Sequence, residues 1–314
     1  WITDGTMQGT HIVKDFTQGI AETSPVNFFV FKDKLFFIGE APIDTRALYI
    51  TDGTEQGTME FFNCNEEGCR YPTVLDDQLF FVSDDSIFSH PNNELYISDG
   101  TIEGTHLFLE INPNFIGVTG EMVAAGNKLF FSGDNGEKGS ELWVSDGTIA
   151  GTKMVKDLRK GAKGSSPDNI TPYGGKVVFG AYLKNALGVF FISDGTEQGT
   201  ILLDTLIPSL ATTEISYAIM DGKLYFSGYK SSATGYELCV TDGTPDGTGL
   251  FADINNGIFS SSPSSFLHYH NGFLFSANDD VLKTELFKLE PAVQDVFFSK
   301  NELLQLAWKS FSHL

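Results

Sequence analysis

One eight-residue pattern returns at a nearly constant interval along this chain. Residues 51–58 read TDGTEQGT, and residues 193–200 read SDGTEQGT. A fixed period of 20 to 50 residues is typical of architectures in which each repeat is one supersecondary unit. Successive copies are 47 or 48 residues apart, because the aspartate of the octet stands at Asp4, Asp52, Asp99, Asp146, Asp194 and Asp242.

Other landmarks keep the same interval. An apolar-aromatic pair, often preceded by glutamate, stands before the octet, and a stretch such as KLFF (34–37) comes before the next copy. Segment 141–158, ELWVSDGTIAGTKMVKDL, resembles the ELWxxDGTxxGTxLVKDI repeats of large secreted bacterial proteins. The resemblance covers about residues 1 to 290, with departures at 189–191 and at Cys239. It implies a β-propeller-like extracellular module, and the family has no assigned catalytic residues to carry over.

The residues themselves predict four short strands per repeat. In the first complete repeat these runs are 24–31, 34–38, 47–51 and 58–62, and they are rich in β-branched and aromatic residues. The first two runs meet across a two-residue turn, which in the last repeat we expect at Asn271-Gly272. The last two meet across the octet, whose glycines and Asp and Thr side chains suit a hairpin connector.

The KLFF stretch predicts how the repeats are arranged. Successive side chains of a strand point to opposite faces of a sheet, yet all three residues after the lysine are large and apolar. Each sheet must therefore be covered on both faces, and radial stacking of like sheets provides this cover. We predict an all-β fold, a β-propeller of four-stranded antiparallel blades with a short C-terminal helix.

The repeats assign residues 1–298 to the propeller and residues 299–314 to the helix. Seven blade positions are favoured and six are an alternative, because residues 1–19 supply only two strands and residues 295–299 must supply the last one. The chain begins in mid-repeat at Trp1, which suggests that sequence precedes it. The tail has a capping box, Ser299 with Glu302, and an apolar stripe at helical spacing. This helix would pack on its own propeller or dock into an assembly partner.

The charge balance excludes some classes of partner. The chain has 20 basic and 41 acidic residues, a formal net charge of −21. Such a surface repels phosphate backbones, so no nucleic-acid partner is expected. No apolar run approaches membrane-spanning length, and no signal peptide is visible.

Cysteine usage favours an extracellular location. Cys64 and Cys69 bracket four residues, NEEG, and could form a short disulfide-closed loop, with two free thiols as the alternative. Cys239 stands where other copies have Tyr or Trp and is expected to be buried. Asn169 begins the sequence Asn-Ile-Thr, a glycosylation acceptor in a glycosylating cell.

The loops between the second and third strands differ from repeat to repeat. Loops whose sequence repeats are expected to be part of the scaffold, whereas loops whose sequence varies form a candidate binding face. The alternative is that the variable residues are ordinary solvated loop residues. The candidate residues of this face are Asp84, Asp85, His90, Asp134, Tyr182, Lys184, Tyr229, Asp279 and Asp280.

A second acidic series closes the fourth strands of several repeats, at Asp15, Asp157, Asp204 and Asp253. Recurring carboxylates could ring a calcium ion, because calcium prefers oxygen ligands. The alternative is that each caps the turn to the next blade by accepting backbone hydrogen bonds. No cofactor is required by any motif in the chain.

Catalytic motifs are scarce, since no nucleophile elbow or phosphate loop stands in its required context. The leading hypothesis is a non-enzymatic, secreted or cell-surface binding or assembly module that contacts a protein or glycan ligand through the variable loops. One alternative is a polysaccharide-acting enzyme on a propeller scaffold, by analogy of fold alone. Another is a structural subunit of an extracellular filament or large complex.

Overall fold

A computed structural model describes residues 1–16, 24–41, 45–64, 68–83, 93–183, 188–210, 216–279 and 283–291. The chain divides into two compact units, Trp1–Gly164 and Ser165–Leu314, and each is described by itself. The described residues form strands and turns without a helix, so none of their elements could span a membrane as a helix.

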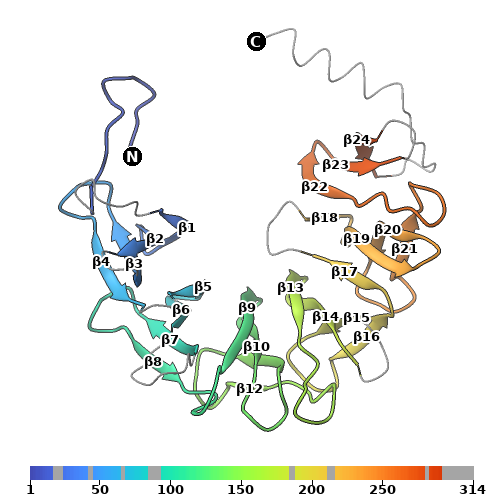
Figure 1. The fold of residues 1–314 in the computed structure, drawn as a ribbon, viewed down its shortest axis with the longest axis horizontal. Coiled ribbons are helices and arrows are strands. Elements are labelled where there is room, and N and C mark those ends of the chain that lie inside the picture. Colours follow the sequence, from blue (N-terminus) through green and yellow to red (C-terminus); the bar gives the residue numbers. More distant parts are fainter. Residues whose placement is uncertain are drawn as a thin grey trace. The chain divides into compact units, whose positions relative to one another are not determined.

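The first unit contains three four-stranded antiparallel sheets, preceded by a hairpin over residues 1–16 in which Ile2 pairs with His11 (Figure 1). In sheet 1 the strands are β1 (Val26–Phe31), β2 (Lys34–Ala41), β3 (Thr45–Thr51) and β4 (Met59–Asn63). Sheet 2 consists of β5 (Arg70–Leu75), β6 (Gln78–Ser83), β7 (Glu94–Ser98) and β8 (His106–Leu109). Sheet 3 consists of β9 (Val118–Ala125), β10 (Lys128–Gly133), β11 (Glu141–Ser145) and β12 (Lys153–Met154).

The second unit contains sheets 4 to 6. Sheet 4 consists of β13 (Asp168–Tyr173), β14 (Lys176–Ala181), β15 (Val189–Ser193) and β16 (Ile201–Asp204). Sheet 5 consists of β17 (Ile207–Ser209), β18 (Tyr217–Met220), β19 (Lys223–Ser231), β20 (Gly235–Thr241) and β21 (Gly249–Ala252). Sheet 6 has three described strands, β22 (Ser264–Tyr269), β23 (Gly272–Asn278) and β24 (Thr284–Leu289).

Each sheet has two apolar faces, which we name by their neighbours. Within a unit, the front face of a sheet points toward the preceding repeat and the rear face toward the following one. In sheet 2, Leu79 and Phe81 on the front face pack with Phe36 of sheet 1. On the rear face of the same strand, Phe80 packs with Phe131 of sheet 3. The prediction that a sheet is covered on both faces is therefore confirmed for sheet 2.

The second unit repeats this packing. Phe226 on the front face of sheet 5 contacts the core formed with Val178 of sheet 4, whereas Tyr225 on the rear face packs with Phe273 of sheet 6. Full burial of one such side chain contributes roughly 1.5–3 kcal/mol. These interfaces between sheets provide the main hydrophobic cores of each unit.

The octet is a hairpin connector, as predicted. In its second copy, Thr54 donates its backbone N–H and its hydroxyl to Asp52 Oδ1, over 2.9 and 2.8 Å. The Gly57 N–H donates to Thr54 Oγ1 over 2.9 Å. Gly53 takes the left-handed region with φ 89°, and Gly57 lies so close to Asp52 that a Cβ there would be 2.0 Å from Oδ1. The motif therefore closes on itself through side chains of its own.

The two-residue turns also follow the sequence, with one correction. Lys32 and Asp33 both have positive φ, as a primed hairpin turn requires. In sheet 6 the turn is His270-Asn271 and not Asn271-Gly272, because Gly272 pairs with Tyr269 inside the ladder. Gly272 is needed in the strand, since a Cβ there would lie 2.1 Å from the Leu289 carbonyl oxygen.

Two predictions about the strands and helices lie outside the described residues. These are the amphipathic helix over 299–314 and the last strand over 295–299. The number of blades and the division at residue 298 therefore stay predictions.

Candidate functional site

Of the predicted binding-face residues, the structure describes Asp134, Tyr182 and Asp279 in loops. The prediction that Tyr229 lies in a loop is wrong, because Tyr229 lies inside β19 and pairs with Tyr236. Asp134 accepts a hydrogen bond from the Gly136 N–H over 2.7 Å, so it caps its own loop. Tyr229 packs on Tyr236, with ring centroids 5.3 Å apart. Tyr182 is exposed, and the backbone N–H of Asp279 donates to the Lys283 carbonyl. The other candidates, Asp84, Asp85, His90, Lys184 and Asp280, lie outside the described residues.

Two carboxylates of the acidic series pair with lysines. Asp157 lies 3.3 Å from Lys138 Nζ. Asp204 forms an ion pair with Lys230 and accepts the Leu206 N–H over 3.2 Å, which is the turn-capping role. Asp15 and Asp253 are exposed. Nowhere in the described ranges do three or more His, Cys, Asp or Glu side chains gather as a metal would require, and calcium binding stays a prediction.

Several of the glutamates before the apolar-aromatic pairs are buried and bond to backbone N–H groups. The sequence shows that these glutamates recur, but their role was not predicted from it. Glu94 accepts the Ile111 N–H over 2.6 Å. Glu237 accepts the N–H groups of Ile254 and Ser261 over 2.8 and 2.7 Å. Burial raises the pKa of Glu237, and these hydrogen bonds oppose the rise. These side chains tie the third strand to the loop that leads to the next sheet.

The cysteine predictions are confirmed where the structure describes them. Cys64 and Cys69 form a disulfide, with Cα atoms 5.1 Å apart. Cys239 is free and buried, and burial raises the pKa of its thiol to about 12. Asn169 lies within β13 and is half-buried, with Thr171 of its acceptor sequence buried.

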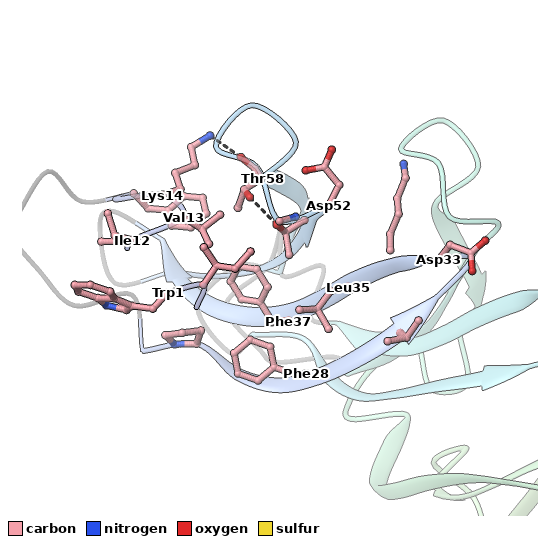
Figure 2. Close-up of a pocket in the computed structure, with 17 residues that line it drawn as sticks. Trp1, Ile12, Val13, Lys14, Phe28, Asp33, Leu35, Phe37, Asp52 and Thr58 are labelled. Atoms are coloured by element: carbon pink, nitrogen blue, oxygen red, sulfur yellow. Dashed lines mark hydrogen bonds between the residues drawn. The ribbon is translucent and has the colours of Figure 1, made fainter. Parts of the chain in front are cut away.

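The first unit contains an apolar groove of about 620 Å³, shown in Figure 2. One wall is the hairpin of residues 1–16, including Trp1, Ile12 and Lys14. The floor is the front face of sheet 1, where Val30 is 68% exposed and Leu35 is 36% exposed. We call this feature the open groove.

The local packing explains why the groove remains open. Phe37 stacks on Tyr49 at 5.3 Å, and Phe16 covers Tyr49 at 4.6 Å, so the outer half of the front face is closed. The hairpin of residues 1–16 corresponds to the third and fourth strands of a repeat. Beyond this hairpin, Val30 of β1 and Leu35 of β2 remain exposed.

The groove combines apolar walls with four charged side chains. Its charged groups are Lys14, Lys34, Asp33 and Asp52. Lys14, Asp33 and Asp52 lie at the rim around apolar walls (Figure 2). Lys14 Nζ donates to the Thr58 carbonyl over 2.5 Å. The Thr51 and Thr58 hydroxyls bond to each other over 2.6 Å, and Thr58 Oγ1 also lies within hydrogen-bond distance of the Thr54 carbonyl oxygen. The described residues that line the groove include no histidine, cysteine or serine.

Comparisons with known proteins agree on the fold. No family model matches the sequence, and no curated protein matches it. Oligopeptidase B from Leishmania major has a TM-score of 0.56 at 14% identity, over 94% of this chain and 43% of that chain. Prolyl oligopeptidase B from Galerina marginata has a TM-score of 0.55 at 11% identity, over 91% of this chain and 43% of that chain.

A third solved structure, from a study of two prolyl endopeptidases, has a TM-score of 0.53 at 13% identity and covers 88% of this chain and 42% of its own. The matched parts are β-propeller domains. The chain has a β-propeller fold. It spans less than half the length of these structures. At sequence identities this low, the similarity shows a shared fold and does not show a shared function.

Proposed function

We propose that the protein is a non-enzymatic, extracellular or cell-surface module for binding and assembly, and that the open groove is its main protein contact. The observation that carries the proposal is the exposed apolar floor of the groove at Val30 and Leu35. Exposed apolar surface rimmed by charge is typical of protein–protein contact sites. The variable loops, with the exposed Tyr182, remain a candidate second contact for protein or glycan.

One feature supports an extracellular setting. The Cys64–Cys69 disulfide is of a kind that persists in oxidising compartments. The net charge of −21 favours solubility and disfavours nucleic acid. The peptidase activities named for the similar structures belong to chains more than twice as long, and they are not part of this proposal.

A photo-crosslinking amino acid at position 30 tests the proposal. Val30 is exposed, so the replacement should leave the fold intact. We expect light to couple this position to a protein partner at high yield. The matched control is position 115, because Phe115 lies in the same unit and is 64% exposed. Equal labelling at the two positions would contradict a groove-directed contact.

A polysaccharide hydrolysis assay tests the enzyme alternative. We expect no new reducing ends from any polysaccharide offered to the purified protein. Turnover that is lost on replacing Tyr182 by alanine, but kept in a groove variant, would favour the enzyme over the binding module.

A further inference from the structure

The segment that follows β12 differs in charge from the other segments that connect one sheet to the next. Residues 155–167 contain one acid, Asp157, and four basic residues, Lys156, Arg159, Lys160 and Lys163. The connecting segments 64–69, 110–117, 205–216 and 253–263 contain no lysine or arginine. Because the repeat does not require basic residues at this place, their cluster indicates a role of this loop and not of the scaffold.

The cluster also contrasts with the charge of the whole chain. Residues 155–167 have a net charge of +3, whereas the other 301 residues have 16 basic and 40 acidic residues, a net charge of −24. Exposed charges are largely screened beyond the Debye length, which is about 8 Å at physiological ionic strength. The potential at this loop is therefore set mainly by its own basic residues, and it attracts anions although the chain is acidic.

Two glycines fix this loop against the loop between β10 and β11. A Cβ on Gly139 would lie 2.4 Å from the Gly164 nitrogen, and one on Gly164 would lie 2.3 Å from the Ser140 carbonyl oxygen. Only glycine allows two backbones to approach so closely. Lys138 Nζ of the first loop also lies 3.3 Å from Asp157 Oδ2 of the second. The two loops therefore form one surface.

The basic side chains of this surface, which we call the basic platform, are Lys138, Arg159, Lys160 and Lys163. The backbone N–H of Arg159 donates to Glu141 Oε1 over 3.1 Å, and its Nη1 donates to the Gly164 carbonyl over 3.5 Å. Lys160 and Lys163 are exposed, and the side chain of Lys138 is 44% exposed. Because the backbone is already fixed, a ligand does not have to order the loop, which lowers the entropic cost of binding.

The platform lacks the apolar side chains on which protein contacts usually depend. In residues 134–140 and 159–164 the only apolar side chain is that of Ala162. The residues that contribute most to protein interfaces are enriched in Trp and Tyr and lie in well-packed pockets. Clusters of lysine and arginine are instead typical of contacts with polyanions such as nucleic acid and heparin. The composition of the platform therefore favours an anionic polymer.

We propose that the basic platform binds an acidic polysaccharide through its carboxylate or sulfate groups. This inference rests on the proposed function and names the ligand class at one of the variable loops. Lys138 is paired with Asp157, so Arg159, Lys160 and Lys163 make the main contacts, as charge-assisted hydrogen bonds. Duplex DNA has one charge per about 1.7 Å of its axis, and the acidic remainder of the chain repels this dense charge more strongly than the sparser charge of a polysaccharide.

Paired lysine variants test the proposal by affinity electrophoresis of the full chain. The probes are polygalacturonate, dextran sulfate and, as a neutral control, dextran. Wild type should be retarded by at least one of the two acidic polymers and not by dextran, and added salt should weaken the binding. Replacing Lys160 and Lys163 together by glutamine should weaken it by about tenfold or more.

The matched control is the variant with both Lys176 and Lys223 replaced by glutamine. These lysines are exposed and begin β14 and β19, so the control removes the same charge away from the platform. Its binding should change by less than about twofold. Thermal melting of both variants checks the fold, and K163Q alone repeats the test if the platform variant unfolds.

Three results would overturn the proposal. One is a wild type that binds neither acidic polymer. Another is an equal loss in the two double variants, because net charge and not the platform would then determine binding. The third is stronger binding to poly-L-glutamate or duplex DNA than to either polysaccharide, which would make an acidic protein or a nucleic acid the partner. If neither polysaccharide binds but position 30 still crosslinks to a protein, the proposed binding function stands and the platform is not its ligand site.

Discussion

The second glycine of each octet is required because any side chain there would collide with the carboxylate of the octet aspartate. Its own backbone angles do not require glycine. In the last octet, a Cβ on Gly247 would lie 2.0 Å from Asp242 Oδ1. Gly249, two residues further along, has ordinary room, since a Cβ there would meet Asp204 Oδ2 at 3.9 Å. These two glycines provide a matched pair for testing how the connector is built.

Replacing Gly247 by alanine should lower the free energy of unfolding by about 1–3 kcal/mol, because the new methyl group displaces the Asp242 carboxylate from Thr244. Replacing Gly249 by alanine should change it by less than about 0.5 kcal/mol. Urea unfolding of both variants measures the difference. Equal losses would show that the carboxylate contact is not what requires glycine.

The octet aspartates should make stability sensitive to acid. Hydrogen bonds from the Thr244 hydroxyl and N–H lower the pKa of Asp242 below its usual 3.8, and equivalent threonines act on Asp4, Asp52, Asp99 and Asp146. A carboxyl with a lowered pKa in the folded state stabilises the fold above its unfolded pKa. This contribution is lost as the pH falls through the folded pKa.

The free energy of unfolding should therefore fall as the pH is lowered below about 4. The Asp242→Asn variant keeps an acceptor oxygen but does not titrate, so its stability should fall less steeply over that range. Urea titrations at several pH values give both slopes. Identical slopes for wild type and variant would contradict a pKa shift at Asp242.

At the scale of single residues, the sequence predicted the octet well because its contacts are local. Asp52 and Thr54 are two residues apart, and spacing alone indicates their bond. The role of Glu94 was not predicted, because its partner Ile111 is 17 residues away across a loop. When a side chain bonds to backbone far away in the sequence, the sequence shows only which residue type recurs. Here that residue is the glutamate before the apolar-aromatic pair.

At the scale of elements, the strands of sheet 1 were predicted to within a few residues, since alternation and turn residues are strong local signals. The β-bulges in the first strand of several repeats were not predicted. The register shifts between Val26 and Phe29 in β1 and between Arg70 and Thr73 in β5. Asn27 and Tyr71 take positive φ in these bulges. Such bulges depend on the neighbouring strand, which the sequence of one strand does not specify.

The disulfide offers a test at this scale. Cys64 and Cys69 close a short loop after β4, and both lie in the core between sheets 1 and 2. Replacing both by serine should lower the free energy of unfolding by roughly 2–4 kcal/mol, because the unfolded chain loses a constraint and the core loses apolar contacts. Thermal or urea unfolding measures the loss, with Phe115→Ser as a surface control. A loss no larger than that of the control would show that the bridge is not structural.

At the scale of the whole molecule, the sequence predicted the β-propeller fold because the two-faced KLFF strand recurs in each repeat. It did not predict the open groove, which depends on how far Phe16 and Trp1 reach over sheet 1. The positions of these two side chains are set by packing against residues far away in the sequence, which no local sequence pattern indicates.

The account depends most on the claim that the front face of sheet 1 is a docking surface. Photo-crosslinking at position 30, compared with position 115 in the same unit, tests it most directly. We expect light to couple position 30 to a protein partner, and V30D should weaken the binding of that partner. Position 115 should couple far less. Equal labelling at the two positions, or a partner whose binding V30D leaves unchanged, would contradict the claim.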